Sequence, residues 1–292
     1  MPPVALPFTP DVAGHVERLF IYPVKSCAGI ELAEALLLAT GLEWDRRWMV
    51  VDAAGTFVTQ RTLPRMALVR PAFEAGALLL HAPGMPALPV PLQSNAPTLT
   101  VQVWDDSLAA DDMGDAAAAW LSGFLGQRLR LVRFASGARR LSSRKWTGDV
   151  DATLQFSDAF ALLVTSSAAL VEVNRRLEAS GEPPVGIERF RPNLVLGGVP
   201  AHDEDHMALL QLATAGGVVQ LQPVKPCVRC TIPNVDPASG HSHPAVSDAI
   251  QTYRHDARME GAVTWGMNAI VRAGAGLRLA VGQPAEASYR FD

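Results

Sequence analysis

The stretch most diagnostic of the fold is Lys225-Pro226-Cys227-Val228-Arg229-Cys230-Thr231-Ile232-Pro233-Asn234-Val235-Asp236-Pro237, which follows a predicted strand at 218–224. Its prolines predict a loop, because proline supplies no N–H group to a sheet. Two cysteines three residues apart can bind zinc, form a redox disulfide or offer one thiolate to a metal. The neighbouring Lys225 and Arg229 favour a thiolate over a pair of buried apolar thiols. The spacing alone leaves these interpretations open.

Two histidines, His241 and His243, follow this stretch at a distance that a small loop can close. With Cys227 and Cys230 they make up a possible Cys2His2 set of the kind that holds structural zinc. A zinc site is therefore one alternative to a single bond between a metal and a thiolate.

A cluster of similar chemistry lies near the start, in Phe20-Ile21-Tyr22-Pro23-Val24-Lys25-Ser26-Cys27-Ala28-Gly29. A predicted strand ends at the proline and is followed by an ammonium group, a hydroxyl and a flexible glycine. Lys25 and Ser26, together with free backbone N–H groups, suit a phosphate, although the GxxxxGK[ST] pattern of a P-loop is absent. Taken alone, such a lysine is more often a solvated surface residue.

Three further clusters carry donors and acceptors. In Asp45-Arg46-Arg47-Trp48, the planar guanidinium of Arg46 suits a phosphate or a carbonyl-rich ring, or else a surface salt bridge. In Arg189-Phe190-Arg191-Pro192-Asn193, Arg191 and Asn193 point to the same side of an extended stretch and can bind a ring edge, while the alternative for Asn193 is to satisfy a turn. In Phe156-Ser157-Asp158, the carboxylate of Asp158 can accept from a ring N–H group or cap a turn.

Residues 15–134 read mostly as short strands punctuated by turn residues, at 16–24, 33–39, 48–52, 56–59, 66–69, 77–81 and 99–104. The clearest hairpin joins 48–52 to 56–59 through a turn in which Gly55 can adopt positive φ. Closely spaced strands of this kind predict a barrel or a sandwich. One helix is predicted before Gly126, because four apolar residues share a face: Ala117, Trp120, Leu121 and Phe124.

Residues 135–150 are the best candidate linker, because they lack periodicity and are polar and basic. A solvated loop is the alternative. Beyond them we expect strands at 159–165, 194–197, 218–224, 269–272 and 277–281, and helices at 245–255 and from Ser166 or Ser167 to Gly181. The chain is therefore predicted to be α+β and strand-dominated, without regular βαβ alternation.

Composition argues against several classes of function. The 292 residues are 49% hydrophobic and 18% charged with a net charge of −4, so the chain can bury a sizeable core but offers no basic stretch for nucleic acid or an anionic membrane. No apolar run approaches the roughly 20 residues that span a bilayer, and residues 1–14 lack Lys and Arg. Three cysteines form no disulfide framework, which favours a reducing compartment. We expect a cytoplasmic protein without a membrane anchor.

Together the clusters resemble the MOSC family, specifically proteins in which a MOSC N-terminal β-barrel domain precedes a MOSC domain, such as the mitochondrial amidoxime-reducing components and the bacterial YcbX proteins. The resemblance covers nearly the whole chain and rests on the order and spacing of six segments, at 21–27, 45–48, 156–158, 190–193, 227–230 and 235–237. It implies an N-terminal β-barrel-like domain at 12–135 and a β-rich, cofactor-binding MOSC domain with a few helices at 150–292.

The resemblance also implies a molybdenum cofactor, in which molybdopterin carries the metal, with the metal bound to Cys230 and with Cys227 only a neighbour. Positions that match family contacts to the phosphate or the pterin are Lys25, Ser26, Arg46, Asp158, Arg191 and Asn193. Val228 and Arg229 match cofactor-lining positions, although the compared family member has Ser before the Arg, and Asn268 stands where a tyrosine can occur. A soft thiolate suits the metal, and an anionic phosphate suits Lys and Arg from separate loops.

The activity implied by the resemblance is two-electron reduction of N-hydroxylated substrates such as amidoximes, hydroxylamines and N-hydroxylated bases. An all-cysteine [2Fe–2S] cluster needs four thiolates, so we expect no iron–sulfur cluster in this chain and electrons from a separate protein. The alternative is a cofactor carrier or sulfur-transfer protein, since MOSC domains also end molybdenum-cofactor sulfurases. Without a pyridoxal-phosphate desulfurase domain, such a protein would receive its sulfur from elsewhere.

Overall fold

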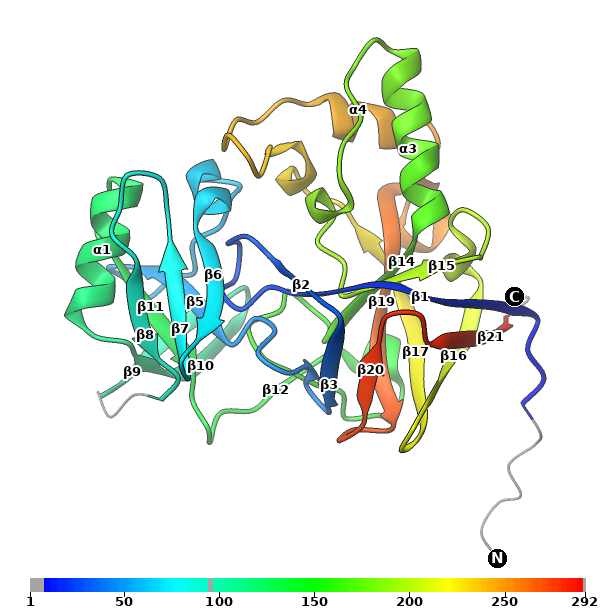
Figure 1. Cartoon of the computed structure of the whole chain (residues 1–292), viewed down its shortest axis with the longest axis horizontal. Helices are drawn as coiled ribbons and strands as arrows, with labels where there is room; N and C mark the ends of the chain where they lie inside the picture. Colours follow the sequence, from blue (N-terminus) through cyan, green and yellow to red (C-terminus); the bar gives the residue numbers. More distant parts are fainter. Residues whose placement is uncertain (1–7, 94–96, 291–292) are drawn as a thin grey trace, which may run out of the picture.

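The computed structural model describes residues 8–93 and 97–290. Residues 1–7, which belong to the segment without Lys or Arg, and residues 291–292, which end the predicted second domain, lie outside the described residues. Strands hold 42% of the chain and helices 19%, which confirms the strand-dominated α+β fold class (Figure 1). None of the described helices is both long enough and apolar enough to cross a membrane.

Seven strands close into a barrel, in the order β14 (Leu162–Ser166), β15 (Leu194–Gly197), β1 (Val12–Ile21), β21 (Pro284–Tyr289), β16 (Met207–Thr214), β17 (Gly217–Val228) and β19 (Ala262–Ala273). The ring closes because β19 also pairs with β14, and every pairing is antiparallel except that between β14 and β15. Two short strands extend the sheet, β2 (Ile30–Leu32) beside β1 and β18 (His255–Asp256) beside β19.

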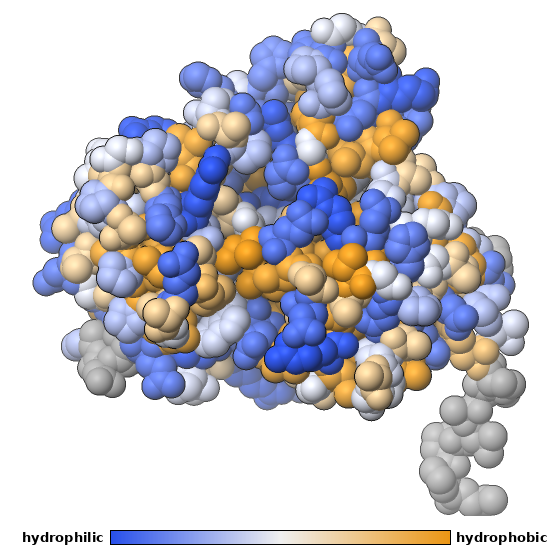
Figure 2. All heavy atoms as spheres, viewed as in Figure 1, coloured by the Kyte–Doolittle hydropathy of each residue, from blue (hydrophilic) through white to orange (hydrophobic). Residues whose placement is uncertain are grey.

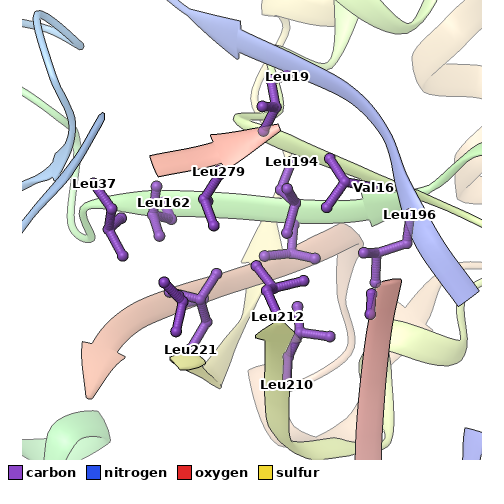
Figure 3. Close-up of a cluster of buried hydrophobic side chains, with 14 of the residues drawn as sticks. Val16, Leu19, Leu37, Leu162, Leu194, Leu196, Leu210, Leu212, Leu221 and Leu279 are labelled. Carbon is purple, nitrogen blue, oxygen red and sulfur yellow. The ribbon is translucent and has the colours of Figure 1, made fainter. Parts of the chain in front are cut away.

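The barrel interior is filled by aliphatic side chains that alternate along its strands. Leu194 and Leu196 on β15 converge with Leu210 and Leu212 on β16 and with Leu221 on β17, as Figure 3 shows. Each of the five is at most 2% exposed. Burial of such side chains stabilises a fold by roughly 1.5–3 kcal/mol each, so this cluster fixes the barrel strands whose ends carry the site residues.

The first half forms a separate lobe with its own core, at the left of Figure 1. Its sheets are β5 (Trp48–Asp52), β11 (Leu129–Phe134), β10 (Asp106–Asp112) and β9 (Thr98–Val103) in one, and β6 (Arg70–Glu74), β7 (Ala77–His81) and β8 (Leu88–Pro91) in the other. Helix α1 (Asp115–Leu125) buries the predicted Ala117, Trp120, Leu121 and Phe124. It ends at Gly126 in the left-handed conformation, as predicted.

The sheets do not follow the predicted division at 135–150. Strand β1 belongs to the barrel, and β3 (Glu34–Leu38) pairs with both β4 (Gly41–Leu42) and β20 (Arg278–Ala280) near the C-terminus. Strands β1 and β3 therefore pack with the second half, while the domain bounds themselves stay a prediction. The linker segment itself contains β12 (Arg140–Leu141), paired with β13 (Thr153–Leu154), and the helical turn α2 (Arg144–Thr147).

Two helices cover the top of the barrel in Figure 1, α3 (Ser167–Ala179) and α4 (Ala245–Gln251), and α4 ends earlier than the predicted residue 255. The prediction of a strand at 66–69 is wrong: Pro64 begins a 3-10 helix, η1 (Pro64–Leu68). The segment 56–59 forms isolated bridges rather than a strand, although Gly55 turns the chain with φ +81° as predicted. The remaining 3-10 turns are η2 (Ile187–Arg189), η3 (Asp203–Asp205), η4 (Ile232–Asn234) and η5 (Ala257–Met259).

The expected loop at 225–228 is wrong as well, because β17 continues to Val228. Two prolines of β17, of which Pro226 belongs to the expected loop, lie beside irregularities of the ladder, which shifts register between Pro223 and Lys225 and again between Pro226 and Val228. Proline is tolerated in a strand at such bulges, where no N–H group is required.

Candidate cofactor-binding cleft

All ten residues predicted for the site line one cleft. They are Lys25, Ser26, Arg46, Asp158, Arg191, Asn193, Val228, Arg229, Cys230 and Asn268. Most of the chain separates Lys25 from Asn268 in the sequence, so the fold brings these residues together.

The cleft residues sit where barrel strands begin or end. Lys25 and Ser26 follow β1, Asp158 precedes β14, Arg191 and Asn193 precede β15, and the two cysteines lie at the end of β17. Three of these residues have left-handed backbones, with φ +64° at Ser26, +46° at Arg46 and +58° at Arg191. Non-glycine residues adopt this conformation at a cost of order 1–3 kcal/mol, and such strain concentrates at functional sites.

Lys25 is buried and its ammonium group is fully engaged by the other side of the cleft. Its Nζ donates to the Phe156 carbonyl at 2.8 Å and lies 2.5 Å from Oδ1 of Asp158. Burial lowers the pKa of Lys25, and the Asp158 charge opposes that shift. The protein around Asp158 favours the neutral carboxyl, yet the Lys25 ammonium and the indole N–H of Trp104 outweigh it and hold the pKa of Asp158 below its usual range.

Arg46 is fixed by three partners from both halves of the chain. Its Nη1 donates to Oδ2 of Asp45 at 2.6 Å and to Oδ1 of Asn193 at 3.0 Å, while Nη2 donates to the Arg191 carbonyl at 3.2 Å. Asp45 is itself buried, and burial raises its pKa against the opposing charge of Arg46. Protein acceptors thus hold both terminal nitrogens of the guanidinium in place where it lines the cleft.

Asn193 has a larger structural role than the sequence suggested. Its amide nitrogen donates to the Phe20 carbonyl at 3.1 Å, and its amide oxygen accepts from the Leu163 backbone N–H at 3.1 Å as well as from Arg46. The side chain is 1% exposed. It ties β1 to the start of β14 beneath the cleft, and a further hydrogen bond from this side chain reaches Asp45.

Arg191 and Arg229 each carry a buried unpaired donor in the cleft. Arg191 donates from Nη1 to the Cys27 carbonyl at 2.6 Å, and its buried Nη2 has no acceptor within the described chain. Arg229 donates from Nη2 to the Phe190 carbonyl at 3.0 Å, and its buried Nε likewise lacks a described acceptor. Burial and the nearby Arg46 charge lower the pKa of Arg191 to about 10. Orphaned buried donors of this kind indicate a missing polar partner.

The three cysteines differ in environment. Cys227 and Cys230 are half-buried and line the cleft, and Nη1 of Arg229 donates to Sγ of Cys227 at 3.2 Å. Cys27 is fully buried, and burial raises the pKa of its thiol to about 12. Cys27 is therefore an inert packing residue, and only the two other thiols are presented to a ligand.

The zinc alternative is not supported. His241 and His243 border a different depression from the one that Cys227 and Cys230 line. Within residues 8–93 and 97–290, no group of three or more His, Cys, Asp or Glu side chains is arranged to hold a metal ion. The described chain leaves Cys227 and Cys230 as thiols without a histidine partner.

Two arginines that shape the cleft were not predicted from the sequence to do so. Arg61 lines it directly, and Arg140, in the expected linker, is buried behind it. Arg140 donates to the backbone carbonyls of Gln155, Ser157 and Asp158 and pairs with Asp106 at 2.6 Å, which holds the 155–158 loop in place. A basic segment of low periodicity gave no signal that one of its arginines is buried.

The surroundings of the cleft are open on one side. Arg191 and Ile232 also line a neighbouring depression bounded by Gly29, Pro71 and Glu188. Figure 2 shows this face of the molecule hollowed between the lobe that carries α1 and the lobe that carries α3 and α4.

Comparison with known proteins finds two family matches, the MOSC N-terminal beta barrel domain over residues 13–128 and the MOSC domain over residues 151–285. The human mitochondrial amidoxime reducing component 2 is 34% identical over 78% of this chain and 68% of its own length. The mouse mitochondrial amidoxime-reducing component 1 is 37% identical with the same coverage. Bovine molybdenum cofactor sulfurase is 29% identical over 84% of this chain but only 29% of its own length.

Proposed function

Because the chain belongs to the family in which a MOSC N-terminal β-barrel domain is joined to a MOSC domain, we propose that its cleft binds a molybdenum cofactor and reduces N-hydroxylated substrates. One observation carries the proposal: ten residues chosen from widely separated segments line a single cleft. The names of the amidoxime-reducing relatives supply the substrate class.

The donor set of the cleft fits this cofactor. Lys25, Arg46, Arg191 and Arg229 face it from four separate segments, which suits an anionic phosphate. The unpaired N–H groups of Arg191 and Arg229 can donate to carbonyl oxygens or ring nitrogens of a pterin. Cys230 offers a thiolate, the soft ligand appropriate to the metal.

Each side chain then has a proposed role. Cys230 binds the metal; Lys25, Ser26 and Arg46 contact the phosphate or the pterin. The further contacts to the pterin come from Asp158, Arg191, Asn193, Val228, Arg229 and, less directly, Asn268. Asn193 acts mainly through Arg46, because three of its hydrogen bonds are already made within the protein. Asn268 donates from Nδ2 to the Lys225 carbonyl at 3.3 Å and so braces β17 beside the cysteines.

When bound, the cofactor supplies the two-electron redox chemistry. Reduction of an amidoxime to an amidine breaks the N–O bond, takes up two electrons and two protons, and releases one water. The residues of the chain hold the substrate against the metal side of the cleft, where Cys227, Val228 and Cys230 form the wall. The electrons come from a separate donor protein in this proposal, and the cytoplasmic location expected from the sequence stays a prediction.

A cofactor-carrier or sulfur-transfer role is the second candidate. The similarity to the bovine molybdenum cofactor sulfurase favours it, as does the Arg229 guanidinium beside the Cys227 thiol. In this version a cleft cysteine thiolate attacks the outer sulfur of a persulfide on another protein; the new S–S bond forms as the donor's S–S bond breaks, and the donor is left as a thiol. Persulfide detected on Cys230 by mass spectrometry, in protein that lacks reductase activity, would favour the carrier.

The direct test is an assay of purified, molybdenum-loaded protein with benzamidoxime and a chemical electron donor. Benzamidine should form in proportion to the molybdenum content of the sample. The proposal is contradicted if loaded protein gives no more benzamidine than protein prepared without molybdenum.

A further inference from the structure

Arg61 is a cleft residue to which neither the sequence clusters nor the proposed cofactor contacts assign a role. It follows the hairpin after β5 and is held locally by Thr59, which is 5% exposed. The Thr59 hydroxyl accepts from the Arg61 backbone N–H at 3.3 Å and from its Nε at 3.1 Å. One side of the guanidinium is therefore fixed by a buried hydroxyl.

Two aromatic rings hold the rest of the guanidinium in place. The central carbon of the Arg61 guanidinium lies 4.6 Å from the Trp104 ring centroid and 5.9 Å from that of Phe57. Trp104 is anchored in turn, because its indole N–H donates to Oδ1 of Asp158 at 3.0 Å. Its ring is 45% exposed, which places this cation and its aromatic support where the cleft meets solvent.

The terminal nitrogens of Arg61 remain available. Within the described residues neither its Nη1 nor its Nη2 has a hydrogen-bond acceptor, and no carboxylate lies within ion-pair distance. The other cleft cations are more fully engaged. Lys25 is bound to Asp158, and Arg46 and Arg229 each use both terminal nitrogens on protein acceptors. Arg191 keeps Nη2 unpaired but donates from Nη1 to the Cys27 carbonyl. A planar fork with both ends unpaired matches the two oxygens of a carboxylate or a phosphate.

We propose that Arg61, supported by Trp104, binds an anionic group of the substrate, so that N-hydroxylated compounds bearing a carboxylate or a phosphate are preferred over cationic ones. This inference rests on the proposed reductase function. The anion is assigned to the substrate because Arg61 stacks on Trp104, which is 45% exposed, whereas the proposed cofactor contact Lys25 is 4% exposed.

The test compares three benzamidoximes, neutral, para-carboxylate and para-trimethylammonium, in wild-type, Arg61→Gln and Arg61→Lys protein. In the wild type, KM for the carboxylate should be at least roughly tenfold below that for the cation. Arg61→Gln should abolish the difference by raising KM for the carboxylate, and Arg61→Lys should restore part of it. Arg65→Gln is the matched control, since Arg65 is exposed and stacks 4.5 Å over Phe124 outside the cleft.

Three outcomes would overturn the inference: equal KM values for the three substrates in the wild type, an undiminished charge preference in Arg61→Gln, or loss of molybdenum from that variant, which would assign the anion to the cofactor. Calorimetric binding of 4-carbamoylbenzoate, which carries no N–O bond, separates this inference from the reductase proposal. Arg61→Gln should bind it about tenfold more weakly than the wild type, with or without turnover, while equal binding would contradict the assignment.

Discussion

The ammonium nitrogen of Lys25 lies 2.5 Å from Oδ1 of Asp158, although 133 residues separate the two along the chain. The Lys25 side chain is 5% exposed and that of Asp158 is 59% exposed. The ion pair therefore spans the predicted boundary at 135–150, and the structure fixes a buried cation at the cleft before any ligand arrives. This preorganisation is what an anion-binding site requires.

Lys25→Met should remove cofactor retention without unfolding the protein. The variant eliminates a buried charge, and Asp158 keeps its bond to Trp104, but the Phe156 carbonyl loses its donor, so the free energy of unfolding should fall by about 1–3 kcal/mol. Molybdenum per chain should fall at least tenfold by elemental analysis, with urea unfolding as the stability measurement. Lys145→Met, at an exposed lysine, is the control and should retain its molybdenum. Equal molybdenum in the two variants would remove Lys25 from the site.

Arg140→Gln should destabilise the 155–158 loop, which contributes Asp158 to the cleft. The change leaves the buried carbonyls of the 155–158 loop without their donor, which should lower the free energy of unfolding by about 2–4 kcal/mol. Cofactor content should fall as well, because Asp158 loses its support. The neighbouring Arg139→Gln removes only an exposed pair to Asp151 and should change stability by less than about 0.5 kcal/mol. Similar unfolding curves for the two variants would mean that Arg140 does not organise the loop.

Asn193→Ala tests whether this residue is mainly structural. It leaves the Phe20 carbonyl and the Leu163 N–H buried and unpaired, so apoprotein should lose about 2–4 kcal/mol in urea unfolding. Asn193→Asp keeps the acceptor for Leu163 and Arg46 and should lose less. If Asn193→Ala apoprotein is as stable as wild type, the amide serves the ligand rather than the fold.

Glu204 gives the stability of the protein a specific pH dependence. Its side chain is fully buried, with Oε1 accepting from the Thr165 hydroxyl at 3.2 Å, and burial together with the charge of Asp205 raises its pKa to about 7. The folded chain thus holds a proton that the unfolded chain releases near pH 4.5. Stability falls as pH rises from about 4.5 to 7, since ionisation of the buried carboxyl opposes folding.

Glu204→Gln should remove this dependence. Relative to wild type, the variant should gain on the order of 2–3 kcal/mol between pH 5 and pH 8, as measured by urea unfolding at each pH. Glu178→Gln, at an exposed position on α3, should follow the wild-type curve. A constant difference between wild type and Glu204→Gln at all pH values would show that Glu204 does not titrate in this range.

The residues of the candidate cleft could be selected from the sequence because their order and spacing resemble a known family, although each cluster alone was indecisive; that they bind a cofactor stays a prediction. Lys25, Asp158 and Cys230 each belong to a short segment that ends or precedes a strand, and such segments meet at the ends of a closed barrel. The roles of Arg61 and Arg140 were not predicted, because the sequence around an isolated arginine in a polar segment does not indicate whether its side chain faces solvent or the interior.

The fold class was predictable from the sequence, whereas several individual strands were not. Periodicity found α1, β5 and β7, whose apolar faces are regular. Strands β10 and β21 were missed, because Asp106–Asp112 is rich in aspartate and Pro284–Tyr289 in alanine, and pairing with neighbouring strands decides their conformation. The membership of β1 in the barrel depends on contacts with β15 and β21 that lie far away in the sequence.

The most direct test of Cys230 as the metal ligand is the molybdenum and pterin content of three proteins purified in parallel: wild type, Cys230→Ser and Cys227→Ser. Both thiols line the cleft and both are half-buried, so each variant is the matched control for the other. Cys230→Ser should retain less than about a tenth of the wild-type molybdenum, since a serine hydroxyl is a poor substitute for a soft thiolate, and Cys227→Ser should stay near the wild-type content. Full molybdenum content in Cys230→Ser, or an equal loss in both variants, would contradict the assignment of Cys230 as the metal ligand.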